Sequence, residues 1–368
     1  MSAPVAAPEA AHLFSPLQIR EIAFRNRVLV SPMCQYSSED GFANDWHLVH
    51  LGSRAIGGAG AVIAEATAVE ARGRISPEDL GIWKDEHIEP LARIARFVKQ
   101  QGAVPGIQLA HAGRKASTDV PWRGGGPLSA SAGGWQPVAP SAVPFDEHSI
   151  VPTELKVDEI HSIVEKFASA AERALEAGFE LLELHGAHGY LMHEFLSPIS
   201  NKRADRYGGA LENRMRFALE VAAAVRRVWP ERLPLFLRIS ATDWAEGGWT
   251  IDESVELARS VRPIGVDAID CSSGGTVPHA RIPLQPGYQA PFAERIRHET
   301  GILTGAVGLI TEPAQADTLV RNGSADVVLL AREFLREPYW PIKAAQALGA
   351  DARFPIQYAR AFPAPVSK

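Results

Sequence analysis

The feature that most constrains the fold is a series of eight short, continuous apolar segments, most of them followed by a stretch with amphipathic helical spacing. Continuous rather than alternating apolar runs are typical of strands that are covered on both faces. The predicted strands are Arg27–Ser31, Ala61–Ala66, Val104–Leu109, Glu180–Leu184, Pro234–Ile239, Val266–Cys271, Ile302–Val307 and Asp326–Ala331. The predicted helices include Glu86–Gln101, Thr153–Ala177, Gly209–Val228, Ile251–Val261 and Glu312–Asn322.

Eight strand-then-helix units are compatible with a closed parallel barrel or with a long doubly wound sheet. Their number, spread over 368 residues, favours the barrel, so the predicted fold class is α/β, a (β/α)8 TIM barrel. Thr311 is placed to cap a helix that begins at Glu312, and Gly178 and Gly323 stand where helices would end.

We expect a single domain over residues 13–368, preceded by a disordered Ala/Pro-rich tail of residues 1–12. A long irregular stretch rich in Gly, Pro and Ser, Lys115–Pro152, follows the third strand. An excursion at that point would lie over the mouth of the barrel. The last residues of the chain are expected to form a C-terminal arm.

Charge and composition exclude several classes of protein. A net charge of −6 without any run of basic residues gives no reason to expect nucleic acid or an anionic membrane as a partner. No stretch approaches the roughly 18 continuous apolar residues of a membrane span, and the N-terminus lacks the basic start of a secretory signal. Two cysteines, Cys34 and Cys271, are too few for a disulfide framework or a four-thiolate Fe–S cluster. We therefore expect a cytoplasmic protein.

Polar or reactive residues follow nearly every predicted strand. In a (β/α)8 barrel the functional side chains project from the carboxyl ends of the strands, so this distribution indicates a site rather than the general polarity of loops. In strand order these residues are Cys34 and Tyr36, Glu65–Thr67, Gln108 and His111, His185, His188 and Tyr190, Arg238, Ser272–Gly275, Gly308, and Ala331–Arg332.

The motifs SPMCQY, EAT, GIQLAHAGR, ELHGAHGYLMHEFLSPISNKRADRYGG, LENRMRF, GAVGLI and LLARE, in that order, resemble those of the old yellow enzyme family. The cysteine after the first strand and the segment PIQYAR resemble its thermophilic-like, xenobiotic-reductase subclass. The resemblance extends from Leu13 to Phe362. It implies an ene-reductase with non-covalent FMN, NADPH or NADH as a transient hydride donor, and an enone- or quinone-like acceptor.

The resemblance also implies a set of FMN-binding residues, and their chemistry is suitable. A cation such as Arg238 would stabilise negative charge on the N1–C2=O edge of a reduced flavin, although a salt bridge inside the barrel is an alternative role. Gln108 has both a donor and an acceptor for the pyrimidine ring. The implied FMN-binding residues are Ser31, Pro32, Met33, Cys34, Ala66, Gln108, Arg238, Gly308, Ala331 and Arg332.

Phosphate binding is expected after the seventh and eighth strands, where barrels commonly hold it. Gly308 permits close approach of the backbone, and the guanidinium of Arg332 is suited to phosphate oxygens unless it forms a surface ion pair. The glycine-rich segment at Gly57 precedes a strand rather than following one, so it is not a dinucleotide fingerprint. The nicotinamide donor would therefore bind transiently over the flavin.

The implied catalytic residues are His185, His188 and Tyr190, with both histidines also contacting the substrate. The histidines would donate hydrogen bonds to a carbonyl oxygen, and Tyr190 would protonate the α-carbon. Tyr36 matches a second substrate-contacting phenol. The HxxH spacing also permits a zinc site with Glu183 or His111, but we expect no metal.

Three features remain open at the level of sequence. Cys34 would tune the flavin potential, or it is an inert thiol. Trp122 and Trp135, on the excursion, line the substrate pocket or pack on the surface. Arg360 matches an arginine that reaches a neighbouring subunit's active site, which implies a homodimer or homotetramer, although Ala361–Phe362 departs from the usual Gly-aromatic continuation.

A passive flavin- or phosphate-binding barrel is the non-enzymatic alternative for the whole chain.

Overall fold

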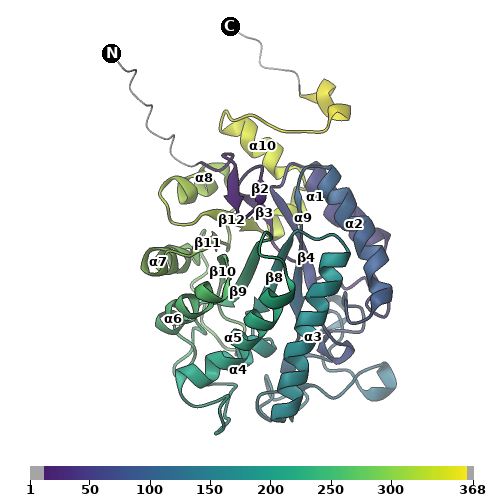
Figure 1. Cartoon of the computed structure of the whole chain (residues 1–368), viewed down its shortest axis with the longest axis vertical. Coiled ribbons are helices and arrows are strands. Elements are labelled where there is room, and N and C mark those ends of the chain that lie inside the picture. Colours follow the sequence, from purple (N-terminus) through teal and green to yellow (C-terminus); the bar gives the residue numbers. More distant parts are fainter. Residues whose placement is uncertain (1–11, 363–368) are drawn as a thin grey trace.

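A computed structural model describes residues 12–362, and eight of its strands form a closed, all-parallel barrel (Figure 1). The barrel strands are β3 (Val28–Val30), β4 (Ala61–Ala68), β5 (Val104–Ala110), β8 (Leu181–Gly186), β9 (Leu235–Ser240), β10 (Ala268–Ser272), β11 (Leu303–Ala306) and β12 (Val327–Leu330). β12 pairs with β3, which closes the barrel in the order of the sequence. The predicted (β/α)8 TIM barrel and its eight strands are confirmed.

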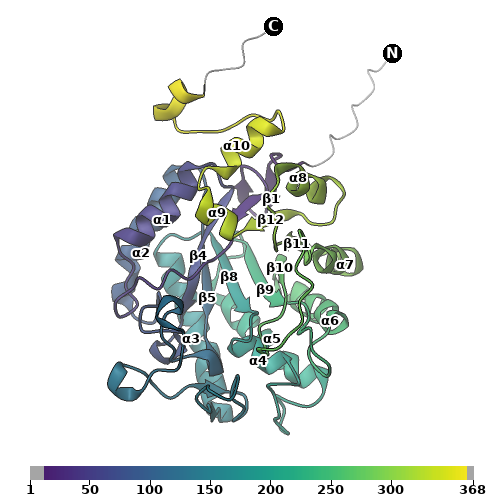
Figure 2. The ribbon, with the colours of Figure 1, turned by 180° about the vertical axis from the view of Figure 1, so that it is seen from behind.

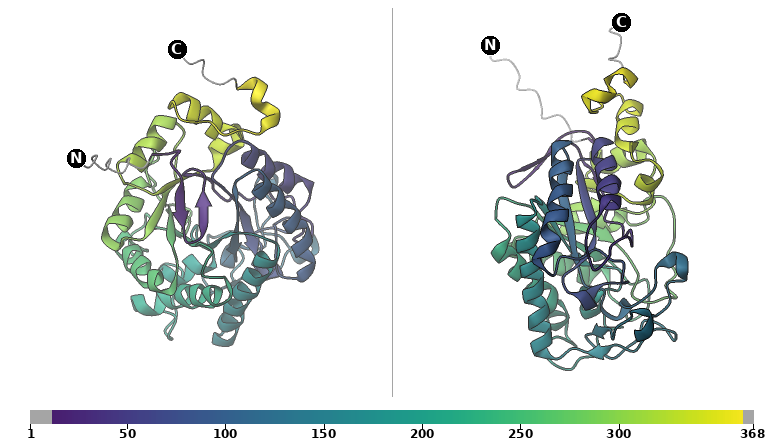
Figure 3. Two further views of the ribbon diagram at one scale, coloured as in Figure 1. Left: turned by 45° about the horizontal axis from the view of Figure 1, so that its top comes forward. Right: turned by 90° about the vertical axis from the view of Figure 1, so that its right-hand side faces the viewer.

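Helices surround this barrel on its outer face (Figures 2 and 3). The longer ones are α1 (Asp45–Ile56), α2 (Ile88–Gln100), α3 (Val157–Glu176), α5 (Leu211–Val228), α6 (Ile251–Val261), α7 (Ala290–Thr300), α8 (Pro313–Arg321) and α10 (Trp340–Ala347). Two shorter helices, α4 (Leu191–Leu196) and α9 (Arg332–Arg336), follow β8 and β12. The apolar sides of the helices and the outward-facing strand residues form one large buried cluster, which includes Phe167, Phe217 and Trp340.

Two local predictions are wrong. α8 begins at Pro313 with Glu312 as its N-cap, so Thr311 lies one residue too early to cap it. The predicted helix Thr153–Ala177 begins only at Val157, because Thr153–Glu154 forms a short strand, β7, that pairs with β6 (Val138–Ala139). The predicted tail lies outside the described residues except for His12, whose carbonyl accepts a hydrogen bond from the Ser15 hydroxyl at 2.7 Å.

An N-terminal hairpin covers the amino-terminal end of the barrel (Figure 3, left). Its strands, β1 (Leu17–Ile19) and β2 (Ile22–Phe24), are antiparallel and joined by Arg20 and Glu21. Ile19 and Phe24 are buried in a cluster that also contains interior residues of the barrel, among them Ile63 and Phe236. The hairpin therefore closes one end of the barrel with apolar side chains.

Above this apolar base the barrel interior becomes polar. Because side chains alternate along a strand, residues two apart on one strand lie in successive interior layers. Two residues beyond the apolar Leu181, Phe236 and Ala268, the same strands carry Glu183, Arg238 and Asp270, and Gln108 of β5 pairs in register with Glu183. Two residues further on, at the carboxyl ends, stand His185, Ser240 and Ser272. Polarity thus increases along the barrel axis toward the carboxyl ends of the strands.

The excursion and the C-terminal arm lie at opposite ends of the barrel. The excursion begins after β5 and lies with α4 at the carboxyl ends of the strands (Figure 1). Beyond α10 the arm extends away from the body of the molecule at the end where the hairpin lies (Figures 1 and 3). Over residues 12–362, no helix has both the length and the apolar character needed to cross a membrane.

Phe24→Ala should lower the free energy of unfolding by about 3–5 kcal/mol, because it leaves a cavity at the closed end of the barrel where Phe24 is fully buried. Urea denaturation followed by circular dichroism measures the change. Val151→Ala, at a side chain that is 56% exposed, should alter the same quantity by less than about 0.5 kcal/mol. Equal effects of the two substitutions would contradict a packed hairpin.

Candidate active site

The floor of the candidate site is a buried group of polar side chains on neighbouring strands. Gln108 donates through Nε2 to Glu183 Oε1 at 2.7 Å. Arg238 donates through Nη1 to Ser31 Oγ at 2.8 Å, and its Nε lies 3.2 Å from Asp270 Oδ2. Within the described part of the chain, the bond to Ser31 is the hydrogen bond that the Arg238 guanidinium makes, and its buried Nε has no hydrogen-bond partner. A buried amide and a buried guanidinium are thus held in fixed orientations facing the carboxyl ends.

The predicted catalytic residues are close together above this floor. The ring of His185, at the end of β8, lies 5.1 Å from the ring of His188 and 5.1 Å from that of Tyr190. The His185 ring is nearly perpendicular to each of the other two, with interplanar angles of 88° and 85°. The structure therefore brings all three predicted side chains into one group.

Both histidines are neutral. Burial, followed by the nearby charge of Arg238, holds the pKa of each well below the usual value for histidine. Nδ1 of His185 accepts a hydrogen bond from the backbone N–H of Ala187 at 3.2 Å, so Nε2 carries the single proton and can donate it. Nε2 of His188 lies 2.7 Å from the hydroxyl of Ser272. When Ser272 donates to that nitrogen, Nδ1–H of His188 remains as the donor.

Tyr190 is protonated and lies close to a lysine that the sequence did not single out. Burial raises the pKa of Tyr190 well above the usual value for a phenol. The ammonium of Lys115 lies 5.2 Å from the centre of the Tyr190 ring, and it donates to the backbone oxygens of His188 and Gly275 at 2.9 and 3.2 Å. Burial, followed by Arg114, lowers the pKa of Lys115 to about 8. Lys115 thus links the loops after β8 and β10, here called the rim loops, and places a cation beside the Tyr190 phenol.

One wall of the site comes from the segment after β3. Cys34 is a partly exposed free thiol, and burial raises its pKa well above the usual value. The ring of Tyr36 contacts Trp122 of the excursion edge-on, with centroids 5.8 Å apart. Trp135 lies elsewhere, since its ring nitrogen donates to the Arg72 carbonyl at 2.8 Å and its ring stacks on Arg74. Of the two tryptophans, Trp122 is therefore the one beside the candidate site.

The loops after β10, β11 and β12 meet at the expected phosphate end. Gly308 has a φ of +115°, and a Cβ there would lie 2.8 Å from the amide nitrogen of Gln289. Gln289 accepts from Ser273 Oγ at 2.7 Å and donates to the Val307 carbonyl at 3.0 Å, which joins the loops after β10 and β11. Arg332, at the first position of α9, is exposed. Gln289 was not predicted from the sequence, because no motif marks it and its partners lie 16 and 18 residues away in other loops.

The two rim loops carrying His188 and Gly275 touch through their backbones. A Cβ on Gly275 would lie 2.6 Å from Cα of His188, and one on Gly189 would lie 2.2 Å from the Gly275 oxygen. His188 itself has a φ of +61°, which is uncommon for a residue with a side chain. The glycines are therefore required by this close approach, and they fix the backbone on which His188 and Tyr190 stand.

A buried network supports the same loop from beneath. Nδ1 of His193, in α4, accepts from the backbone N–H of Gly189 at 2.9 Å, and its Nε2 lies 2.9 Å from Asp243 Oδ1. Thr276 and Ser197 donate to the Asp243 carboxylate at 2.7 and 2.6 Å. Although burial acts to raise it, contacts with His193, Ser197 and Thr276 lower the pKa of Asp243 to about 2. The ionised carboxylate of Asp243 thus stabilises the loop that carries His188 and Gly189.

The alternative partners for a zinc ion are occupied. Nε2 of His111 lies 2.8 Å from Glu70 Oε1, and its Nδ1 accepts from the Gly113 backbone at 3.0 Å. Glu183 accepts from Gln108 in the layer below the histidines. Over residues 12–362, no group of three or more His, Cys, Asp or Glu side chains is arranged to hold a metal ion.

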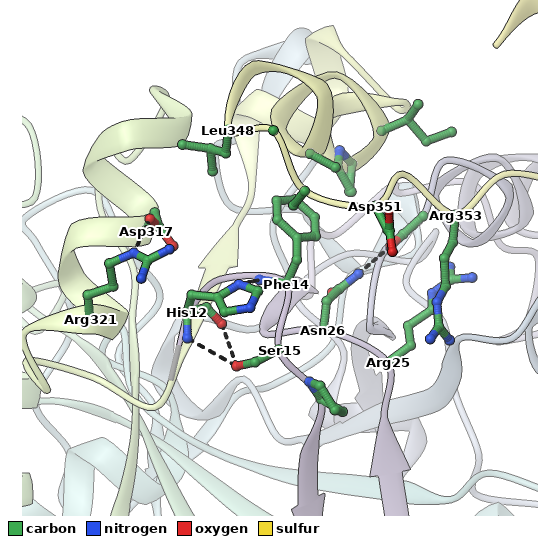
Figure 4. Close-up of a pocket in the computed structure, with 17 residues that line it drawn as sticks. His12, Phe14, Ser15, Arg25, Asn26, Asp317, Arg321, Leu348, Asp351 and Arg353 are labelled. Atoms are coloured by element: carbon green, nitrogen blue, oxygen red, sulfur yellow. Dashed lines mark hydrogen bonds and ion pairs between the residues drawn. The ribbon is translucent and has the colours of Figure 1, made fainter. Parts of the chain in front are cut away.

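A separate cavity of about 540 Å³ lies between the hairpin end of the barrel and the C-terminal arm (Figure 4). Arg25 and Arg321 line it, but Arg25 donates to the carbonyls of Ala59, Gln101 and Ala55, and Arg321 pairs with Asp317. None of the predicted catalytic residues lines this cavity. Arg360 is exposed on the arm at the same end, away from the His185 group.

The residues at the carboxyl ends fit a flavin phosphate such as FMN. Gln108 and Arg238 offer the amide and cation that a pyrimidine edge requires, and among the described residues the Arg238 guanidinium donates one hydrogen bond, to Ser31. Ala66, beside a bulge in β4, has no side chain beyond Cβ to obstruct a planar ring. The barrel, the floor formed by Gln108 and Arg238, and the loops that carry His188 and Gly275 are together those of a flavin-dependent oxidoreductase.

Comparison with known proteins agrees with this class. Residues 12–351 match the family described as NADH:flavin oxidoreductase / NADH oxidase. The chain is 51% identical over 350 residues to an NADPH dehydrogenase of Geobacillus sp. (strain WCH70), covering 95% of this chain and 98% of that protein. It is 46% identical over 353 residues to an NADPH dehydrogenase of Bacillus subtilis (strain 168), covering 95% and 99%. The chain belongs to the NADH:flavin oxidoreductase / NADH oxidase family, which agrees with the predicted old yellow enzyme family and its FMN cofactor.

Solved structures give the same result. Morphinone reductase superposes with a TM-score of 0.78 at 27% identity, covering 94% of this chain and 92% of that one. An old yellow enzyme homologue from Zymomonas mobilis, at 24% identity and a TM-score of 0.75, shares the fold and covers 94% and 95%. The predicted family and the predicted flavin oxidoreductase class are confirmed.

Asp243 should make folding stability depend on acid pH. Its pKa of about 2 lies below the unfolded value of 3.8, so the stabilisation is present above about pH 4 and is lost as pH falls toward 2. The shift corresponds to about 2 kcal/mol. Unfolding free energies measured in urea at pH 6 and pH 3 should therefore differ less in Asp243→Asn than in the parent. Asp252→Asn, at an exposed carboxylate, should retain the parent's difference.

Proposed function

We propose that the protein reduces the activated C=C bond of α,β-unsaturated carbonyl compounds. The observation that carries this proposal is the group formed by His185, His188 and Tyr190 above Gln108 and Arg238. In this group, two neutral histidines can donate hydrogen bonds to one substrate oxygen, and the protonated phenol of Tyr190 can give a proton to a nearby substrate carbon. A carbonyl conjugated to an alkene is the substrate that uses both.

The residues divide the chemistry between them. Gln108 and Arg238 would hold FMN, which would supply the hydride chemistry between NADPH and the substrate. His185 and His188 donate to the carbonyl oxygen, and each such donor is worth about 3 kcal/mol as charge develops there. Tyr190 gives its proton to the α-carbon, and the Lys115 ammonium, 5.2 Å from its ring, stabilises the phenolate that remains. The hydride donor NADPH and the unsaturated carbonyl acceptor would bind at one site in turn, which is a ping-pong mechanism.

The cofactor contacts proposed from sequence are consistent with these positions. Gln108 and Arg238 serve the pyrimidine edge, and Ser31 orients Arg238. The remaining proposed contacts are Pro32, Met33, Cys34 and Ala66 at the ring, and Gly308, Ala331 and Arg332 at the phosphate. A morphinone reductase structure contains tetrahydroNAD, which supports a nicotinamide donor that binds at the same mouth. Tyr36, with Trp122 against it, would contact the acceptor.

We further propose a cytoplasmic homodimer or homotetramer. Arg360 is exposed on an arm that points away from this chain's own histidines, so an active site within its reach would belong to a neighbouring subunit. Ala361–Phe362 stands in place of the usual continuation and changes the shape of that contact. Truncating the chain after Pro355 and measuring molecular mass by light scattering tests the role of the arm.

His185→Ala, and to a greater extent His185→Ala with His188→Ala, should weaken the binding of phenols about 10- to 100-fold. A phenolate resembles the enolate, and a hydrogen bond to a charged oxygen contributes about 1.5–3 kcal/mol. Titration of the long-wavelength charge-transfer band with oxidised flavin measures the dissociation constant, while the flavin spectrum reports retained FMN. The exposed His148→Ala should bind phenols as the parent does. Parent-like binding by the double variant would exclude the oxyanion role.

Tyr190→Phe should separate hydride transfer from protonation. Flavin reduction by NADPH needs no phenol and should stay near the parental rate, whereas enone reduction should slow by about 10²–10⁴-fold. Quinones need no carbon protonation and should be spared. Anaerobic stopped flow with an enone and a quinone on the same variant provides the comparison. Equal slowing with both acceptors would mean that Tyr190 positions the substrate and does not protonate it.

A further inference from the structure

The barrel interior beneath the flavin-binding residues contains two carboxyl groups for one cation. Glu183 and Asp270 are 0% and 1% exposed, and Arg238, on the strand between theirs, is 6% exposed. Two positions earlier on the same three strands stand the apolar core residues Leu181, Phe236 and Ala268. His185, two residues beyond Glu183 on β8, lies above and is neutral.

These carboxyl groups have few partners for their burial. Oε2 of Glu183 and both oxygens of Asp270 have no hydrogen-bond partner among the described residues. The Arg238 Nε to Asp270 Oδ2 distance of 3.2 Å is that of an ion pair without hydrogen-bond alignment. Glu183 receives one bond, from the Gln108 amide at 2.7 Å. Two ionised carboxylates with so little compensation would be costly at this depth.

One proton shared by the pair removes the excess negative charge. With it, one carboxylate balances Arg238 and the interior is neutral. The surroundings agree, because burial and the neighbouring Asp270 raise the pKa of Glu183 to about 8, and burial raises the pKa of Asp270. The two groups titrate as a pair, since each disfavours ionisation of the other.

We propose that Glu183 and Asp270 are positioning residues for the flavin, which orient Gln108 and Arg238 and adjust the charge beneath the ring through one shared proton. Glu183 accepts from Nε2 of Gln108, which leaves Oε1 of that amide for the cofactor. Asp270 and Ser31 engage Nε and Nη1 of Arg238, which leaves Nη2. This inference depends on the proposed flavin contacts of Gln108 and Arg238, and not on the proposed acceptor.

The shared proton has a definite consequence for the redox equilibrium. A reduced flavin carries negative charge at its N1–C2=O edge, so it favours the protonated carboxyl pair more than the oxidised flavin does. The apparent pKa of the pair is therefore higher with reduced flavin bound. Between the two pKa values, affinity for reduced relative to oxidised FMN should fall by up to tenfold per pH unit. For a two-electron couple this is about 30 mV per pH unit.

The test measures the midpoint potential of bound FMN and the dissociation constant of oxidised FMN from pH 6 to pH 10, without any acceptor. In the parent, the midpoint potential should show an additional decrease of about 30 mV per pH unit at and above about pH 8. Glu183→Gln retains an oxygen for the Gln108 amide but cannot titrate, so it should lose that decrease. The difference between parent and variant cancels the titration of the flavin ring itself. A parent without the decrease, or a variant that retains it, would overturn the proposal.

Two further variants separate this role from a purely structural one. Glu194→Gln removes another fully buried carboxyl, whose pKa burial raises to about 8, and should retain the parent's profile. Asp270→Asn removes the charge that opposes ionisation of Glu183, so the decrease should move to lower pH. An unmoved decrease in Asp270→Asn would refute the shared proton. Failure of enone reduction with an intact profile would instead reject the proposed substrate class alone.

Discussion

Closure of an eight-stranded parallel barrel is the constraint on which the rest of the molecule depends. It forces every second side chain of each strand into one narrow interior, where side chains from neighbouring strands must share successive layers. The chain fills the lower layers with Ile63 and Phe236 under an apolar hairpin, and the upper layers with Arg238 and His185. Folding stability and redox chemistry are thus assigned to opposite ends of one continuous core.

The catalytic end has a precise geometry because its loops are held by contacts between distant parts of the chain. Gly189 and Gly275 allow two backbones to touch, and Lys115 donates to oxygens of both loops. His193 and Asp243 support the same loop from the helix beneath. Loops alone would hold the histidines and tyrosine loosely, whereas this cross-linking holds their rings at defined separations.

The sequence predicted the barrel because continuous apolar runs mark strands covered on both faces, and each run proved to be a strand. It predicted His185, His188 and Tyr190 because they follow one strand in a dense motif. The hairpin escaped notice, since its Arg20–Glu21 turn has none of the glycine or asparagine that marks short turns. Lys115, Gln289 and Asp243 were missed because their partners lie up to 160 residues away, and only the fold reveals the pairing.

The hairpin that closes the base of the barrel also bears on the end from which ligands would enter. Ile19 and Phe24 fill the base with apolar side chains, and the proposed flavin contacts lie toward the mouth at the opposite end. Under the proposed mechanism, NADPH and the acceptor would use that opening in turn. An acceptor in excess would then occupy the oxidised enzyme and delay NADPH, so the proposed mechanism implies substrate inhibition.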